Sequence, residues 1–131
     1  MPRKKQHHEP EYRVRVFRDP ASNQIAFAVE TTKEFVNFHY ELLLSDEREG
    51  KDIILKILGI HTPRSVMPGI GPARGFRRYK GLSGIIRTIV RNPDGAENTF
   101  KIKIRNSSVD LVEPPTNPFA VFSNEPVELP E

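Results

Sequence analysis

Apolar residues recur at every second position over most of residues 11 to 112, and the recurring residues are mainly β-branched or aromatic. This alternation is typical of β-strands that bury one face. It is clear in the segments 12–16, 25–29 and 36–44, the last of which carries Val36, Phe38, Tyr40, Leu42 and Leu44. Together with the segments described next, it predicts six or seven strands.

Two neighbouring segments depart from the alternation. Residues 52–60 (DIILKILGI) are almost continuously apolar, which fits a central strand buried on both faces or a short helix. We favour the strand, because Gly59 and Pro63 leave little room for three helical turns. Residues 61–75 contain three prolines and three glycines and are expected to form a long loop.

The clearest local signal is a hairpin at Asn92-Pro93-Asp94-Gly95, where proline suits a type I turn and glycine the left-handed position after it. A three-residue loop pairs Asn92 with Ala96 and thereby defines the register of both strands. One face then carries Ile86, Thr88, Val90, Phe100, Ile102 and Ile104. The other face sets Arg91 against Glu97, Ile89 against Thr99, Arg87 against Lys101 and Ile85 against Lys103.

These elements predict an all-β fold, a single antiparallel β-sandwich of immunoglobulin-like type, with a small closed β-barrel as the alternative. The final hairpin, residues 81–104, resembles the last two strands of such sandwiches, although the Cys and Trp signature of immunoglobulin domains is missing. We expect a flexible basic arm over residues 1–10 and the all-β domain over 11–112. Residues 113–131 contain five prolines and no long alternation, so they are expected to form an extended, acidic, proline-rich tail.

Composition limits the class of protein. The chain of 131 residues suits one domain, and the absence of cysteine excludes disulfides, thiolate metal sites and a cysteine nucleophile. The charged residues after Met1 do not resemble a signal peptide, and no apolar run is long enough to span a membrane. We therefore expect a soluble, cytoplasmic protein.

The net charge of +3 conceals a strong segregation of charge along the chain. Residues 53–93 carry eight Lys or Arg and no acid, whereas residues 9–52 carry ten acids against six bases. Residues 106–131 carry five acids and no Lys or Arg. A basic middle is thus flanked by acidic segments.

Within the basic middle, arginine and lysine alternate with Phe76 and Tyr79, a mixture that contacts phosphates while stacking on bases. In the hairpin, Arg87 faces Lys101, a like-charge pair that favours a surface receiving an anion. The predicted polyanion site therefore comprises Arg74, Arg77, Arg78, Tyr79, Lys80, Arg87, Lys101 and Lys103. The structural alternative is that these charges pair with acids of residues 9–52 or of the tail. For the facing pair, an acid from a neighbouring strand would then lie between the two cations.

No catalytic motif is present, and no cofactor or metal is expected. The run Gly69 to Gly75 is only superficially similar to a phosphate-binding glycine loop, because its spacing is wrong and Pro72 removes a donor. The acids Asp46, Glu47, Glu49 and Asp52 are expected to surround a turn at Ser45 to Gly50 rather than bind calcium. His7, His8, His39 and His61 would have to converge by chance to bind a metal.

The sequence thus predicts a non-enzymatic binding module that presents a basic surface to an anionic partner, first of all nucleic acid or a ribonucleoprotein. The second hypothesis is a structural or adaptor subunit that contacts proteins through Ile85, Ile89 and the tail. An enzyme that acts on a phosphorylated small molecule at Gly69 to Gly75 is the third.

Overall fold

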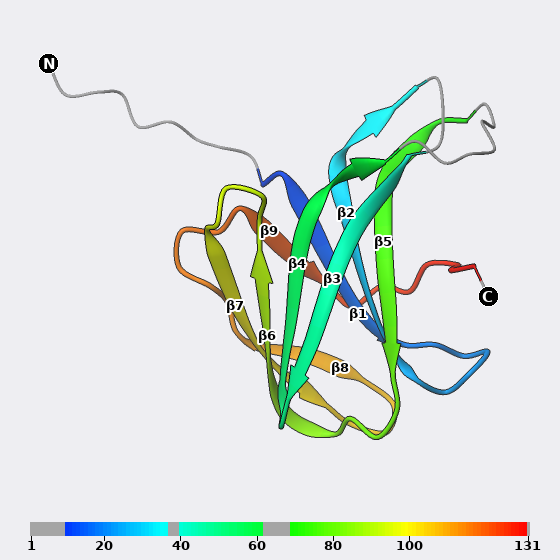
Figure 1. The fold of residues 1–131 in the computed structure, drawn as a ribbon. Coiled ribbons are helices and arrows are strands. Elements are labelled where there is room, and N and C mark those ends of the chain that lie inside the picture. The colour runs from blue at the N-terminus through cyan, green and yellow to red at the C-terminus, as the bar shows by residue number, and fades with distance from the viewer. Residues whose placement is uncertain (1–9, 37–39, 62–68, 131) are drawn as a thin grey trace, which may run out of the picture.

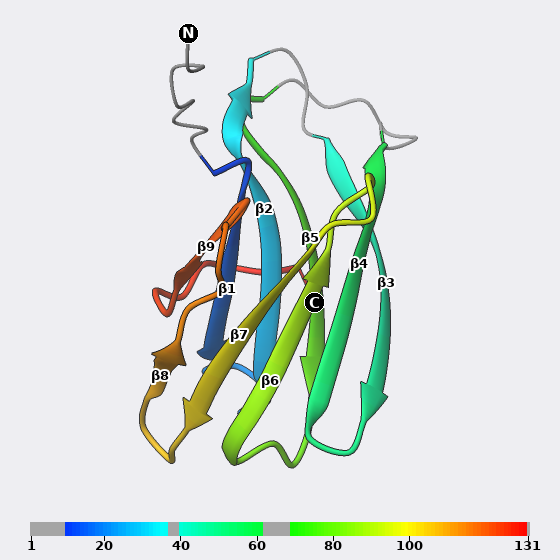
Figure 2. The same cartoon turned by 90° about the vertical axis from the view of Figure 1, so that its left-hand side faces the viewer.

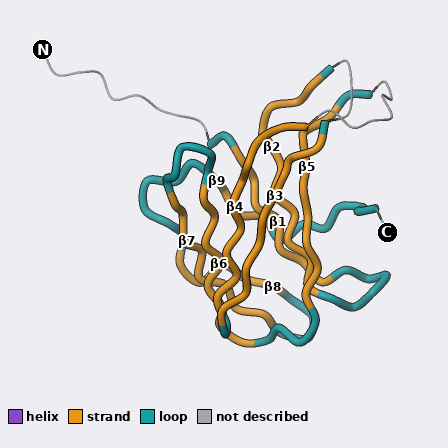
Figure 3. The backbone as a smooth tube through the Cα atoms, in the orientation of Figure 1, coloured by secondary structure: helices purple, strands orange, loops and turns teal. Residues whose placement is uncertain are grey.

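A computed structural model describes residues 10–36, 40–61 and 69–130, and these residues form nine β-strands and no helix (Figures 1 and 3). The strands are β1 (Tyr12–Arg18), β2 (Ile25–Phe35), β3 (Glu41–Glu49), β4 (Asp52–His61), β5 (Gly71–Tyr79), β6 (Gly84–Arg91), β7 (Glu97–Ile104), β8 (Val109–Glu113) and β9 (Ala120–Ser123). The all-β prediction is confirmed. Within these described ranges the protein has no helix that could cross a membrane.

All nine strands of the described chain belong to one sheet, in the order β8-β7-β6-β4-β3-β5-β2-β1-β9. The sheet curls until it is nearly closed, as Figure 2 shows, and so lies nearer to the barrel alternative; the two-sheet sandwich is not confirmed. The antiparallel expectation is wrong in part, because β4 pairs with β6, β3 with β5, and β1 with β9 in parallel. These parallel pairs join segments that are distant in sequence, which short-range patterns do not reveal.

The sheet closes without a backbone ladder between its terminal strands, β8 and β9. Asn124, after β9, donates its side-chain amide to the Val109 carbonyl of β8 at 2.9 Å. The Arg18 guanidinium at the end of β1 donates to the Arg105 carbonyl at 3.1 Å. Side-chain bonds therefore hold the two edges of the sheet together.

The core fills the inside of the curled sheet, and the β6–β7 hairpin supplies much of it. The predicted register is confirmed at every pair, from Arg91 opposite Glu97 to Ile85 opposite Lys103. The amide of Asn92 donates to the Ala96 carbonyl at 2.9 Å, and Gly95 adopts φ 92°, as the turn requires. The six residues predicted to share a face are all buried: Ile86, Thr88, Val90, Phe100, Ile102 and Ile104.

β4 is a strand and not a helix, and it is central, between β3 and β6. The expectation that both its faces are buried is wrong, because Leu58 and Ile60 are largely exposed. The expected strand from Val36 to Leu44 is confirmed only from Glu41 on, where Leu42 and Leu44 are buried, since β2 ends at Phe35 and β3 begins at Glu41. Val36 is exposed, and Phe38 lies outside the described residues.

The expected loop over residues 61–75 is wrong at its end, because β5 already begins at Gly71. Gly75 lies where β5 passes so close to β3 that a Cβ atom would approach the Leu42 carbonyl oxygen to 2.3 Å. The glycine is thus required by strand packing rather than by a phosphate loop. Similarly, the turn after β3 is shorter than expected, because the strand continues through Ser45 to Glu49.

The segment expected to be a tail is part of the fold. β8 extends to Glu113, and β9 forms a parallel ladder with β1 that pairs Tyr12 with Ala120. Ala120 is fully buried, and Phe119 and Phe122 pack against the core. Four residues are enough for this strand because its partner, β1, is already held by β2. No alternation as short as this could be recognised in the sequence.

Candidate binding surfaces

The structure separates the eight predicted polyanion residues into distinct places. Side chains of β5 alternate, so that Arg74 and Arg78 lie on the outer face whereas Arg77 and Tyr79 point towards the interior, where Tyr79 meets Phe27 edge to face. Lys80 follows the strand and is exposed. The three others, Arg87, Lys101 and Lys103, lie on the outer face of β6 and β7.

On the outer face of β1, β2 and β5, arginines surround one buried carboxylate. The side chain of Glu30 is 2% exposed and accepts bonds from Arg13 at 2.9 Å, Arg15 at 3.1 Å and Arg74 at 2.7 Å. Burial alone would raise the pKa of Glu30, but the three guanidinium groups outweigh it and hold the pKa below its ordinary value. Arg74 is therefore committed to an internal ion pair.

Arg78 on the same face is also paired. Its guanidinium donates to the Asp19 carboxylate at 2.8 Å, lies 4.9 Å from the Phe76 ring centroid, and donates to the Pro130 carbonyl at 2.9 Å. The bond from Arg78 lowers the pKa of Asp19. The Phe76 ring, which from the sequence is expected to stack on a base, is thus stacked by Arg78 of the same strand.

Arg77 and Tyr79 bind a common carboxylate on β3. Asp46 accepts a bond from Arg77 Nε at 2.8 Å and one from the Tyr79 hydroxyl at 2.5 Å. The hydroxyl bond lowers the pKa of Asp46, whereas burial and the same bond raise the pKa of Tyr79. Asp46 was expected to surround a turn, and it instead links β3 to β5.

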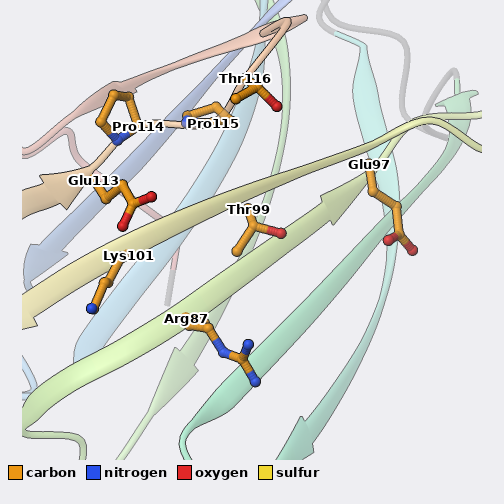
Figure 4. A pocket seen from close by; sticks show the side chains of 8 residues that line it. All are labelled: Arg87, Glu97, Thr99, Lys101, Glu113, Pro114, Pro115 and Thr116. Atoms are coloured by element: carbon orange, nitrogen blue, oxygen red, sulfur yellow. The ribbon is translucent and has the colours of Figure 1, made fainter.

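The outer face of β6 and β7 has acids beside its cations. Arg87 binds Asp52 of β4 through two bonds, at 2.7 and 3.1 Å, and Asp52 raises the pKa of Arg87. Lys101 lies in register with Glu113 of β8, and Lys103 with Asp110. Arg87, Lys101 and Glu113 help to line a pocket of about 420 Å³, and Figure 4 shows the side chains around it. The acidic neighbours thus reduce the repulsion between the facing cations Arg87 and Lys101.

Three of the predicted residues form no ion pair with any described residue, namely Lys80, Lys101 and Lys103. Lys80 has basic neighbours at the same end of the sheet. The Arg48 guanidinium donates to the Lys80 carbonyl at 3.2 Å, and the Lys51 amine lies beside Gly84. Cations therefore gather where the β3–β4 turn meets the loop before β6.

The outer face of β3, β4, β6 and β7, which we call the open face, also carries apolar side chains. Ile54 of β4 lies directly beside Ile89 of β6 in the parallel register. Leu43 and Leu58 are 43% and 59% exposed, and Leu58 is the extra residue of a bulge between β3 and β4. The sequence pattern identified Ile85 and Ile89 but did not reveal that Ile54, Leu43 and Leu58 share their face, because the pairing of β4 with β6 is not local.

The opposite outer face is covered. Residues 124–130 run across β1, β2 and β5, and Figure 2 shows this segment passing behind β2. Val127 and Leu129 pack on Phe17, Phe76 and the buried alanines Ala26 and Ala28. The segment therefore closes a second, smaller apolar cluster outside the barrel, and it leaves the open face uncovered.

The described residues contain no group of three or more His, Cys, Asp or Glu side chains that could hold a metal ion, and His7, His8 and His39 lie outside them. Comparison with protein families, with curated proteins and with solved structures yielded no match. The proposed function therefore rests on the site residues and their geometry.

Proposed function

We propose that this protein is a non-enzymatic adaptor module that binds another protein through its open face. The observation that carries the proposal is the adjacent pair Ile54 and Ile89, which lies on the half of the barrel that residues 124–130 do not cover. Ile54 and Ile89 are partly exposed, and Leu43, Leu58 and Ile85 on the same face are exposed. Apolar side chains grouped in this way and rimmed by polar residues are typical of protein interaction sites.

The charges around this apolar centre support a protein partner rather than a polyanion. Arg87 is paired with Asp52, Arg91 with Glu97 at 2.9 Å, and Lys56 lies 4.0 Å from Glu47. A rim in which both signs alternate gives no strong attraction to phosphates, but it can align with complementary charges on a folded partner. The expected partner surface is an apolar patch with a mixed-charge rim.

Affinity isolation from native lysate, with and without nuclease, tests the proposal. We expect a protein partner that survives nuclease treatment and is lost with Ile89→Lys, which introduces a charge at the apolar centre. The matched control is Val36→Lys, which charges an apolar residue that is 67% exposed directly after β2, a strand that does not belong to the open face. A partner that nuclease removes, or that binds Ile89→Lys as well as the wild type, would contradict the proposal.

Polyanion binding is the second candidate function, and the lysines without ion pairs among the described residues favour it. If Lys80, Lys101 and Lys103 neutralise phosphates, replacing all three by glutamine should lower the salt slope of nucleic-acid binding by about 0.7 to 0.9 per contact. The same replacement at the paired residues Arg74 and Arg78 should leave the slope unchanged. Equal slopes for the wild type and the lysine variant would eliminate this candidate.

A further inference from the structure

The covered face of the barrel carries an apolar strip between two aromatic side chains, which we call the groove. Its floor consists of Ala26 and Ala28 of β2, both fully buried, with Phe17 of β1 on one side and Phe76 of β5 on the other. Small residues between two aromatic rings leave a hollow on an otherwise flat sheet. The hollow is occupied by residues of the C-terminal segment.

The occupant shows what the groove recognises. In the extended segment 125–130, Val127 and Leu129 are partly buried, whereas Pro126, Glu128 and Pro130 are exposed. Two apolar residues at alternate positions thus point into the hollow, as in any extended chain. The prolines on either side favour the extended conformation before binding, which lowers the entropic cost of docking.

Arginines at the two ends of the groove donate hydrogen bonds to backbone carbonyls of the segment. Arg15 donates to the Glu125 carbonyl at 3.2 Å, and Arg78 donates to the Pro130 carbonyl at 2.9 Å. Both arginines are also held by carboxylates of the barrel, Arg15 by Glu30 and Arg78 by Asp19. The two donors therefore remain in place when the segment leaves, so the groove is preorganised for another chain.

The charge of the groove defines the partner further. Four arginines lie on the same outer face, namely Arg13, Arg15, Arg74 and Arg78, and only two acids, Glu30 and Asp19, form ion pairs with them. The excess positive charge suits a segment with acidic residues, such as Glu125 and Glu128 of the present occupant. The contacts depend on main-chain carbonyls and two apolar side chains, and none of them requires that the segment belong to the same chain.

We propose that the outer face of β1, β2 and β5 is a binding site for an extended acidic peptide of a partner protein, with two alternating apolar residues flanked by prolines. Residues 125–130 occupy the site as an intramolecular competitor, favoured by their covalent attachment. The few contacts of these residues must offset the conformational entropy that is lost when the whole segment becomes ordered. A partner peptide of similar sequence can therefore displace them. The site lies apart from the open face and does not depend on the proposed function.

The test uses a fluorescent peptide with the sequence of residues 123–130 (SNEPVELP) and two full-length proteins. One is the wild type, and the other carries Val127→Asp and Leu129→Asp, which expel the segment from the apolar hollow. We expect the peptide to bind the variant at least ten-fold more tightly than the wild type. A peptide with the same two aspartates should not bind, and Ile89→Lys should bind the wild-type peptide as the unmodified protein does.

The controls keep every result interpretable. Circular dichroism and thermal unfolding establish that the variant is folded, and Val127→Ala with Leu129→Ala replaces it if it is not. Absence of binding to the folded variant, or equal affinity for variant and wild type, would overturn the proposal. A wild-type dimer that the peptide dissociates would show that the occupant is a second copy of this chain and would overturn the assignment to a partner protein.

Discussion

Arg77 of β5 donates to the Asp46 carboxylate at 2.8 Å and to the Leu44 carbonyl at 2.7 Å, and so bridges β5 to β3. These two strands share a single backbone pair, Glu41 with Arg74. Elsewhere along this seam, the Arg77 side chain supplies hydrogen bonds that a ladder would otherwise provide. The Arg77 guanidinium and the Tyr79 hydroxyl, which also donates to Asp46, thus join β5 to β3 where the backbone ladder is missing.

Arg77→Gln should therefore destabilise the fold by about 1 to 2 kcal/mol, because the Leu44 carbonyl and Asp46 lose a charged donor. The matched control is Arg91→Gln, whose exposed pair with Glu97 lies on a complete ladder and should contribute less than about 1 kcal/mol. Chemical denaturation measures both. Equal losses in the two variants would show that Arg77 has no special role at the seam.

Gly75→Ala should destabilise the protein by about 1 to 3 kcal/mol, because its Cβ would collide with the Leu42 carbonyl oxygen and the Leu44 side chain. Gly71→Ala is the control, since nothing lies within 4 Å of its Cβ position. Thermal unfolding of both variants distinguishes a packing requirement from a general preference for glycine. Unchanged stability of Gly75→Ala would mean that β3 and β5 lie further apart.

Acid should destabilise the protein through Glu30. Its pKa is lowered in the folded state, so its ion pairs stabilise the fold above the ordinary pKa of 4.5, and this contribution is lost as the pH falls through the folded pKa. Glu30→Gln should cost about 2 to 3 kcal/mol at pH 7 and lose less stability on acidification than the wild type. Glu34→Gln, exposed on the same strand, is the control. If the stability of the wild type and of Glu30→Gln changed equally with pH, the ion pairs of Glu30 would not be the source of the acid sensitivity.

Thr88→Val should stabilise the protein by about 1 kcal/mol. Thr88 is fully buried in the core, and its hydroxyl has no hydrogen-bond partner among the described residues. Valine has nearly the same shape and removes the unsatisfied group. Thr99→Val, on the outer face of the neighbouring strand, should change stability little. A loss of stability in Thr88→Val would indicate that the hydroxyl binds a buried water.

Lys101→Glu should destabilise the protein slightly, by a few tenths of a kcal/mol, because it places a new acid beside Glu113. From the sequence alone, Lys101→Glu is expected to leave stability equal or slightly higher, since the sequence shows Lys101 facing Arg87 but not the acids of β4 and β8. Lys101→Gln separates the loss of the cation from the added charge. Chemical denaturation in low salt measures the difference, and a gain in stability would mean that Arg87 is not neutralised by Asp52.

The structural elements that depend on local chemistry could be predicted from the sequence. The turn at Asn92 to Gly95 determines the register of two strands, and from it follow the buried face and the pairing of Arg91 with Glu97. The partners of Arg74, Arg78 and Arg87 could be anticipated only as a class, because Glu30 and Asp52 lie on other strands and Asp19 lies in the turn after β1. No local sequence pattern predicts the β1–β9 pairing, because the pairing depends on which sheet edge remains open after the other strands have paired.

The parallel ladder between β1 and β9 has a consequence for biosynthesis. β1 is among the first segments of the described chain to leave the ribosome, whereas the residues that pair with its outer edge, Ala120 to Ser123, are among the last. Until they arrive, the hydrogen-bonding groups on this edge face water or other nascent chains, a state that invites aggregation. The alternating charges Arg13 and Arg15 on this strand repel other copies of the same edge during this interval.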